Sequence, residues 1–97
     1  MKALVEAKDF TTVGKDFSCL LYLTGEESGY IYISYINGVK LVEPVKHESA
    51  NIFLTMSTEL FGQMVSGNID VFRAFTSGKI QAKGNVFLAL AVLNALK

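Results

Sequence analysis

The chain has 97 residues, with nine Lys+Arg against nine Asp+Glu, one histidine and one cysteine. This length fits one domain, predicted to span residues 1–97, and the zero net charge without a basic run argues against nucleic-acid binding. Hydrophobic residues make up 51% of the chain, so either a well-filled core or an apolar surface facing a ligand or a second subunit is expected.

Four strands are predicted in the first half of the chain, because runs of β-branched and aromatic residues alternate with glycine-bounded connections. They are "FSCLLYLTG" (17–25), "GYIYISYING" (29–38), "VKLVEPV" (39–45) and "NIFLTM" (51–56). Asn37-Gly38 suits a type I′ hairpin turn, and Pro44 indicates an edge strand or a strand end. We expect these strands to form an antiparallel meander.

Two short helices are predicted next. Ser57 can cap the first, with Glu59 in its first turn near the positive end of the helix dipole, and Gly67 ends it. Asn68 can cap the second, and Gly78 follows its last turn.

The chain then returns to a strand and closes with a helix. In "KIQAK" (79–83), Ile80 and Ala82 are predicted to face inward, and the lysines and glutamine outward. Gly84-Asn85 ends the strand and caps the last helix. The predicted fold is therefore α+β: an antiparallel sheet of about five strands, made of a four-strand meander, helices and a fifth strand, covered by helices.

The last helix is apolar on every side, since residues 86–93 contain no polar side chain. A surface helix normally has one polar face, so a second apolar face predicts a lipid cavity or a partner subunit behind it. The tail has only 12 residues, fewer than the roughly 20 that span a bilayer. With a lone cysteine and no signal-peptide pattern at the start, we expect a cytoplasmic protein without a transmembrane segment.

Catalytic and metal-binding groups are sparse. The single histidine, His47, lies among charged residues and is predicted to be a solvated loop residue, and Cys19 to be a buried, inert thiol. "GQMVSGN" (62–68) has the glycine spacing of a phosphate loop but continues without Lys-Ser/Thr. We expect no enzyme activity, no catalytic residues, no metal and no cofactor.

Two groups of aromatic residues stand out. Tyr22, Tyr30 and Tyr32 share one parity of the first hairpin, which suits either a half-exposed sheet face or an interface. The second group lies in the helical half at core-facing spacing and would suit either the core or the wall of an apolar pocket. It consists of Phe61, Phe72, Phe75 and Phe87.

The segment "FRAFTSGKIQAKGNVFLALAVLNAL" (72–96) resembles the end of the sterol carrier protein 2 (SCP2-like) domain, in which a short helix, a Ser-Gly-Lys turn, an alternating strand, a glycine and an apolar closing helix follow one another. The preceding stretch "NIFLTMSTELFGQMVSGNID" (51–70) is similar to that family's fourth strand and next helix. The resemblance implies an apolar tunnel between sheet and helices that binds fatty acyl chains, sterols or similar lipids.

The resemblance and the strand parity together give the predicted lipid-binding residues. They are Leu21, Leu23, Ile31, Ile33, Phe61, Met64, Phe72, Phe75, Phe87, Leu90 and Leu93. Family domains usually begin with a longer helical segment, whereas only 16 residues precede Phe17 here. This difference implies that one wall of the pocket is shortened or absent, and a second subunit would complete the enclosure.

Two functions fit these observations. The first is non-catalytic binding and transfer of a hydrophobic small molecule, with transient membrane contact and no nucleic-acid partner. The second is a dimerising or accessory module that keeps the fold with a filled pocket and forms a homodimer through the terminal helix.

Overall fold

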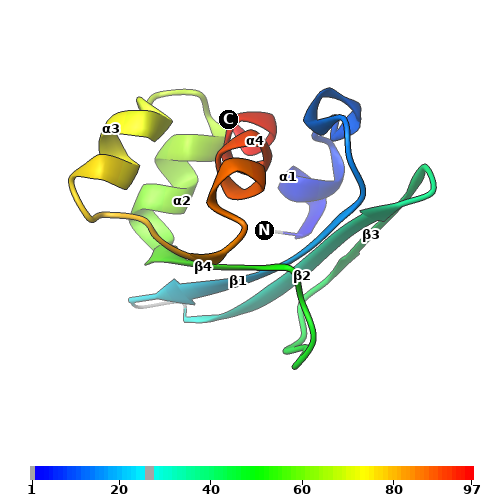
Figure 1. Cartoon of the computed structure of the whole chain (residues 1–97). Coiled ribbons are helices and arrows are strands. Elements are labelled where there is room, and N and C mark those ends of the chain that lie inside the picture. The colour runs from blue at the N-terminus through cyan, green and yellow to red at the C-terminus, as the bar shows by residue number, and fades with distance from the viewer. Residues whose placement is uncertain (1, 26–27) are drawn as a thin grey trace.

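The computed structural model describes residues 2–25 and 28–97. Its strands are β1 (Phe17–Thr24), β2 (Gly29–Ile36), β3 (Val39–Glu43), β4 (Ile52–Ser57) and β5 (Gln81–Gly84), and its helices are α1 (Lys2–Glu6), the 3-10 helix η1 (Thr11–Val13), α2 (Thr58–Val65), α3 (Val71–Thr76) and α4 (Val86–Leu96). One five-stranded sheet carries all the helices on one face, so the molecule has two layers (Figure 1). Among the described residues, no helix is long and apolar enough to cross a bilayer.

The sheet is mixed, with the order β3-β2-β1-β4-β5. The hairpin pairings β1–β2 and β2–β3 are antiparallel, as predicted, and the type I′ turn is confirmed because Asn37 and Gly38 both have positive φ, 53° and 77°. The four-strand meander is wrong, however. β4 does not continue beside β3 but pairs with β1 in parallel, with Cys19 opposite Ile52.

The segment 44–51 explains this difference. It leaves β3 just after Glu43 and passes below the sheet, on the side opposite the helices, before entering β4 (Figure 1). The ring of His47 stacks on Tyr32 of β2 at 3.8 Å between centroids, and the Lys46 ammonium lies 5.5 Å from the Tyr30 ring. These contacts hold the crossover against β2.

The core lies between the sheet and the helices. Residues of one parity on the central strands point into it, including Leu21, Leu23, Ile31 and Ile33, all of them buried. The first part of β1 is covered on both faces, since Ser18 and Leu20 on the opposite parity are also buried, whereas Tyr22 is exposed; such burial is expected for a central strand with a nearly continuous apolar run. The helices complete the core through Phe61, Met64, Val71, Ala89, Val92, Leu93 and Leu96.

Three side-chain caps fix where the helices begin. The Ser57 hydroxyl accepts a hydrogen bond from the Leu60 amide, and the Asn85 side chain accepts one from the Leu88 amide, confirming both predicted caps. The cap predicted for the second helix is wrong by two residues. Asp70, and not Asn68, caps α3 by accepting from the Arg73 amide.

Candidate functional site

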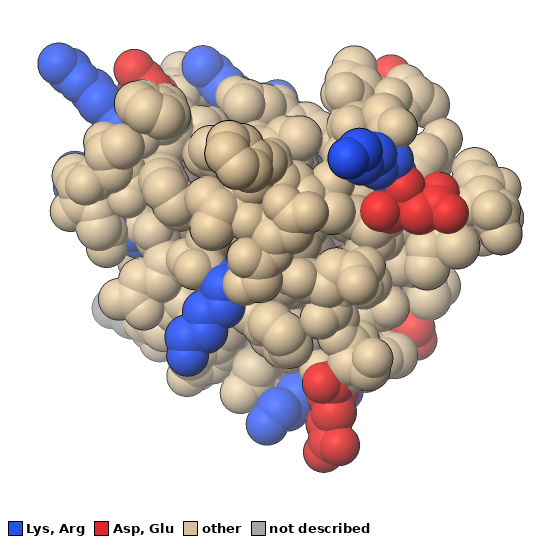
Figure 2. Space-filling view, in the orientation of Figure 1, with Lys and Arg blue, Asp and Glu red and all other residues tan. Residues whose placement is uncertain are grey.

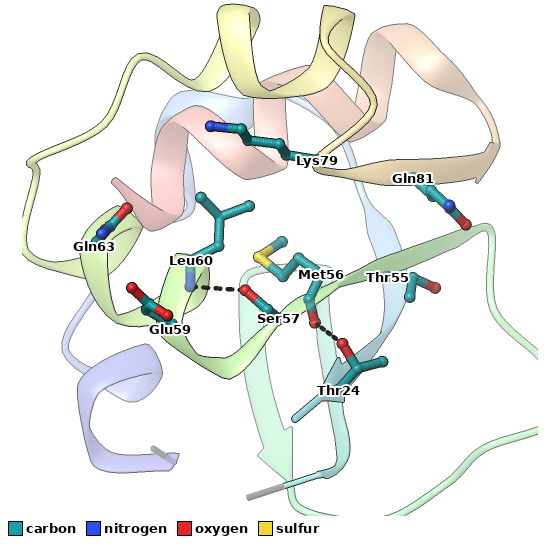
Figure 3. Close-up of a pocket in the computed structure, with 9 residues that line it drawn as sticks. All are labelled: Thr24, Thr55, Met56, Ser57, Glu59, Leu60, Gln63, Lys79 and Gln81. Carbon is teal, nitrogen blue, oxygen red and sulfur yellow. Dashed lines mark hydrogen bonds between the residues drawn. The ribbon is translucent and has the colours of Figure 1, made fainter. Parts of the chain in front are cut away.

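Two adjoining hollows open between α2, α3 and the β4–β5 edge, and we call them together the Lys79 groove. The first has a volume of about 550 Å³ and is lined by Thr24, Thr55, Met56, Ser57, Glu59, Leu60, Gln63, Lys79 and Gln81 (Figure 3). The second, of about 520 Å³, is lined by Leu60, Gln63, Asn68, Ile69, Asp70, Arg73, Ala74, Thr76, Ser77 and Lys79. Leu60, Gln63 and Lys79 belong to both hollows, so the hollows meet there.

Hydrogen bonds between chain segments fix the sheet end of the groove. The Thr24 hydroxyl, at the end of β1, lies 3.5 Å from the Met56 carbonyl oxygen, and the Thr58 hydroxyl donates to the Thr24 carbonyl oxygen at 2.9 Å. The Ser57 cap starts α2 directly after β4. Because these bonds join β1, β4 and α2, this rim of the groove has a defined geometry.

The floor of the groove is apolar and its rim is polar. Met56 and Leu60 are buried, with 2% and 9% of their surface exposed. Around them, Gln63, Lys79 and Gln81 are exposed and make no side-chain hydrogen bond or ion pair within the described residues. An apolar floor with a few unengaged polar groups is the usual construction of a site for an amphiphilic small molecule.

A second surface lies over α4. Phe87, at the start of the helix, exposes 88% of its surface, and it borders a hollow of about 150 Å³. The other lining residues are Val13, Lys15, Asn85, Leu88 and Ala91. Figure 2 shows that the face over α4 is largely free of charged side chains. The apolar second face predicted for this helix is therefore present, and it is open to solvent.

The predicted lipid-binding residues fall into three groups. Seven are buried in the packed core: Leu21, Leu23, Ile31, Ile33, Phe61, Met64 and Leu93. Phe75 and Leu90 are half-buried. Phe72 and Phe87 expose 63% and 88% of their surface, so the interpretation of these two as core phenylalanines is wrong. Phe72 lies on the solvent side of α3 and Phe87 on the solvent side of α4, and Ala74 and Ala89 are among the residues of these helices that are buried in the core.

Sequence reasoning did not select the polar lining of the Lys79 groove. Glu59, Gln63 and Gln81 are common surface residue types, and nothing in their spacing marks them as neighbours. Lys79 carried a usable signal, since it follows the Ser77-Gly78 turn and begins the alternating stretch 79–83, although β5 itself starts two residues later, at Gln81. That alternation places it on the rim beside the buried Ile80.

The isolated reactive groups are structural. Cys19 is fully buried, and this burial raises the pKa of its thiol to about 12, which confirms an inert thiol. His47 is half-buried and not simply solvated, because it stacks on Tyr32 and lies 3.7 Å from a Glu43 carboxylate oxygen. Within the described residues, no three His, Cys, Asp or Glu side chains gather as metal ligands do.

Comparison with known proteins identifies the family. Residues 15–97 match the model of the SCP-2 sterol transfer family. Rat hydroxysteroid dehydrogenase-like protein 2 is 35% identical over 69 residues, which are 70% of this chain and only 13% of that protein. A fatty acid-binding protein of Yarrowia lipolytica is 44% identical over 48 residues, covering 50% of this chain and 37% of that protein.

A solved structure supports the same assignment. The apo form of sterol carrier protein 2 from Yarrowia lipolytica superposes with a TM-score of 0.72 at 27% identity, over 99% of this chain and 75% of that chain. The five-stranded sheet under helices is thus shared with sterol carrier protein 2, as the sequence resemblance implied, but the sheet is mixed and not purely antiparallel as expected. The chain belongs to the SCP-2 sterol transfer family.

Proposed function

We propose that this chain binds a hydrophobic small molecule, such as a fatty acyl chain or a sterol-like lipid, and transfers it without covalent chemistry. The observation that carries the proposal is the Lys79 groove, in which Met56 and Leu60 form an apolar floor under a polar rim. Hollows of about 300–1,000 Å³ are typical of small-molecule sites, and the first hollow has about 550 Å³.

The apolar part of the ligand would enter between α2 and the sheet. Phe61 and Met64 lie behind the floor, together with the inward residues of β1 and β2. Methionine has three flexible torsions and adapts to irregular space, so Met56 and Met64 are suited to repack around an inserted chain. In this proposal the predicted lining residues of the core contact the ligand only after that repacking.

Transfer also requires that the ligand leave and re-enter a bilayer. We include transient contact with a membrane surface in the proposal, and flotation of the protein with phosphatidylcholine vesicles tests it. We also propose that the protein is cytoplasmic, as predicted from its single cysteine.

Native mass spectrometry of the purified protein, combined with organic extraction, tests the main proposal. We expect a bound species of a few hundred daltons, or a one-to-one complex after incubation with palmitate or cholesterol. Leu60→Gln should weaken that complex, whereas Leu41→Gln, the same change on the exposed outer face of β3, should not. A protein that carries no lipid and takes up neither compound contradicts the proposal.

A dimerising or accessory module is the second candidate, and Phe87 is the observation that favours it. The protruding ring stands beside an apolar hollow lined by Leu88 and Ala91, so two copies related by a two-fold axis can each place Phe87 in the hollow of the other. The small share of hydroxysteroid dehydrogenase-like protein 2 that the chain covers, 13%, also fits an accessory unit.

Light scattering after size-exclusion chromatography tests this second candidate. The wild-type protein should show a mass that rises with concentration toward that of a dimer, and Phe87→Ser should hold it at the mass of a monomer. Phe72→Ser is the matched control, because it removes another exposed phenylalanine away from the hollow. A wild-type mass of one chain up to millimolar concentration rejects the dimer.

A further inference from the structure

Lys79 has the most central position of the charged residues in the groove. It lines both hollows, as do Leu60 and Gln63. Figure 3 shows its side chain extending above Leu60 from the connection that precedes β5. Its backbone is held, because its amide donates to the Ala74 carbonyl oxygen at 3.0 Å and the next residue, Ile80, is buried. The ammonium therefore projects over the groove from a fixed base.

The charges around Lys79 differ between the two hollows. In the first hollow the anion is Glu59, which lies on α2 on the other side of Leu60 from Lys79 (Figure 3), and no ion pair joins the two within the described residues. In the second hollow Arg73 is a further cation. The anion there, Asp70, already accepts the Arg73 amide as the cap of α3. The second hollow thus has two cations against one anion, whereas the first has one of each, so positive charge is least compensated where Lys79 faces the second hollow.

We propose that Lys79 binds the anionic head of a single-chain amphiphile at the junction of the two hollows and so selects charged over neutral lipids. This inference rests on the proposed function. The head lies toward Arg73, where Gln63 can also donate from its amide, and the Glu59 carboxylate excludes it from the other end. The hydrocarbon tail crosses Leu60 and Met56 toward the core.

The size of the effect follows from the exposure of the groove. A charge pair at a surface contributes modestly, because water screens it, so replacing Lys79 should weaken binding of an anionic amphiphile about fivefold. Because salt screens this charge pair, a higher salt concentration should reduce the difference in affinity for the anionic amphiphile between the wild type and the variant. The variant should bind a neutral amphiphile with the same tail as tightly as the wild type does, since the apolar floor is unchanged.

Isothermal titration with laurate and with dodecanol, at about pH 8 so that laurate is ionised, tests the inference. Lys79→Gln should lose about fivefold in laurate affinity and keep its dodecanol affinity, and Lys79→Arg should restore laurate binding. Lys83→Gln is the matched control, because Lys83 is an exposed lysine within β5 that lines neither hollow.

The outcomes separate the two proposals. If the wild-type protein binds neither compound, this inference is wrong, whereas the proposed function fails only if palmitate and cholesterol are not taken up either. If it binds both and Lys79→Gln changes neither affinity, only the assignment of Lys79 is wrong. An equal loss of laurate affinity in Lys79→Gln and Lys83→Gln also overturns the assignment of Lys79, because the effect would then come from net charge and not from a contact in the groove.

Discussion

Gly84 is the position where a single methyl group should do the most damage. It ends β5, pairs with Ile52 of β4 and has a φ of +96°, a value that residues with a side chain rarely adopt. A Cβ atom at this position would lie 2.2 Å from the Asn51 carbonyl oxygen, although real Cβ atoms essentially never come closer than 3.0 Å. In Gly84→Ala the distance between this Cβ atom and the Asn51 carbonyl oxygen must therefore increase by at least 0.8 Å, the difference between these values.

The neighbouring backbone cannot easily make this shift. The Asn51 amide donates to the Ser18 carbonyl oxygen at 3.0 Å, and the Ser18 hydroxyl donates to the Asn51 side-chain oxygen at 3.1 Å. Moving Asn51 weakens these bonds, at about 1 kcal/mol each, and the positive φ adds about 1–2 kcal/mol. We expect Gly84→Ala to lower the free energy of unfolding by about 2–4 kcal/mol, and the melting temperature by about 10–25 °C.

Urea unfolding followed by circular dichroism measures the effect, and Gly62→Ala is the control. Gly62 lies within α2, where an added methyl group would have no neighbouring atom within 4 Å beyond the backbone of its own helix. The same chemical change should therefore raise the free energy of unfolding by about 0.5–1 kcal/mol at this site. The expected result is that the free energy of unfolding falls in Gly84→Ala and rises in Gly62→Ala. A Gly84→Ala midpoint equal to or above that of the wild type refutes the steric argument.

Three further predictions concern the core and the caps. Phe61→Ala should cost about 3–5 kcal/mol of unfolding free energy and Phe72→Ala less than about 0.5 kcal/mol, because only the first ring is buried; equal losses in thermal melts would contradict this placement. Asn85→Ala should lower the free energy of unfolding by about 1 kcal/mol, because it removes the cap of α4. An unchanged melting temperature would contradict this role of Asn85. The raised pKa of Cys19, about 12 against 9.0, means that above pH 9 the unfolded thiol ionises while the folded one stays protonated. Stability should therefore fall with rising pH more steeply in the wild type than in Cys19→Ala, and parallel stability profiles would exclude this linkage.

Local structure could be predicted well from the sequence because its causes are local. Alternation of side chains located the strands, and short polar residues before apolar runs located the caps at Ser57 and Asn85. The place of β4 beside β1 could not be predicted this way, since consecutive strands usually pair and segment 44–51 carries no pattern of its own. The nearly continuous apolar run of β1, which is buried on both faces from Phe17 to Leu21, was the available sign of a central strand.

The candidate site was less predictable. Apolar spacing identified interior residues such as Leu21 and Phe61 correctly as buried, but spacing cannot tell a packed core from a lined cavity. The Lys79 groove combines residues from β1, β4, α2 and the start of β5, which only the sheet order brings together. Phe87 was misplaced because residues 86–93 of α4 are all apolar and give no indication of which side of the helix faces the core.

The parallel pairing of β1 with β4, called here the β1–β4 seam, also sets the order in which the parts of the sheet fold. The β1–β2 and β2–β3 hairpins close locally, on a timescale of about 1–10 μs, whereas the seam joins Cys19 to Ile52 and must wait for the intervening chain to be drawn together. Thr24 reaches the groove from one side of the seam, and Met56 and Lys79 from the other. The capacity to bind a ligand should therefore arise only in the last folding step, so a ligand that binds the groove would report completed folding and not hairpin formation.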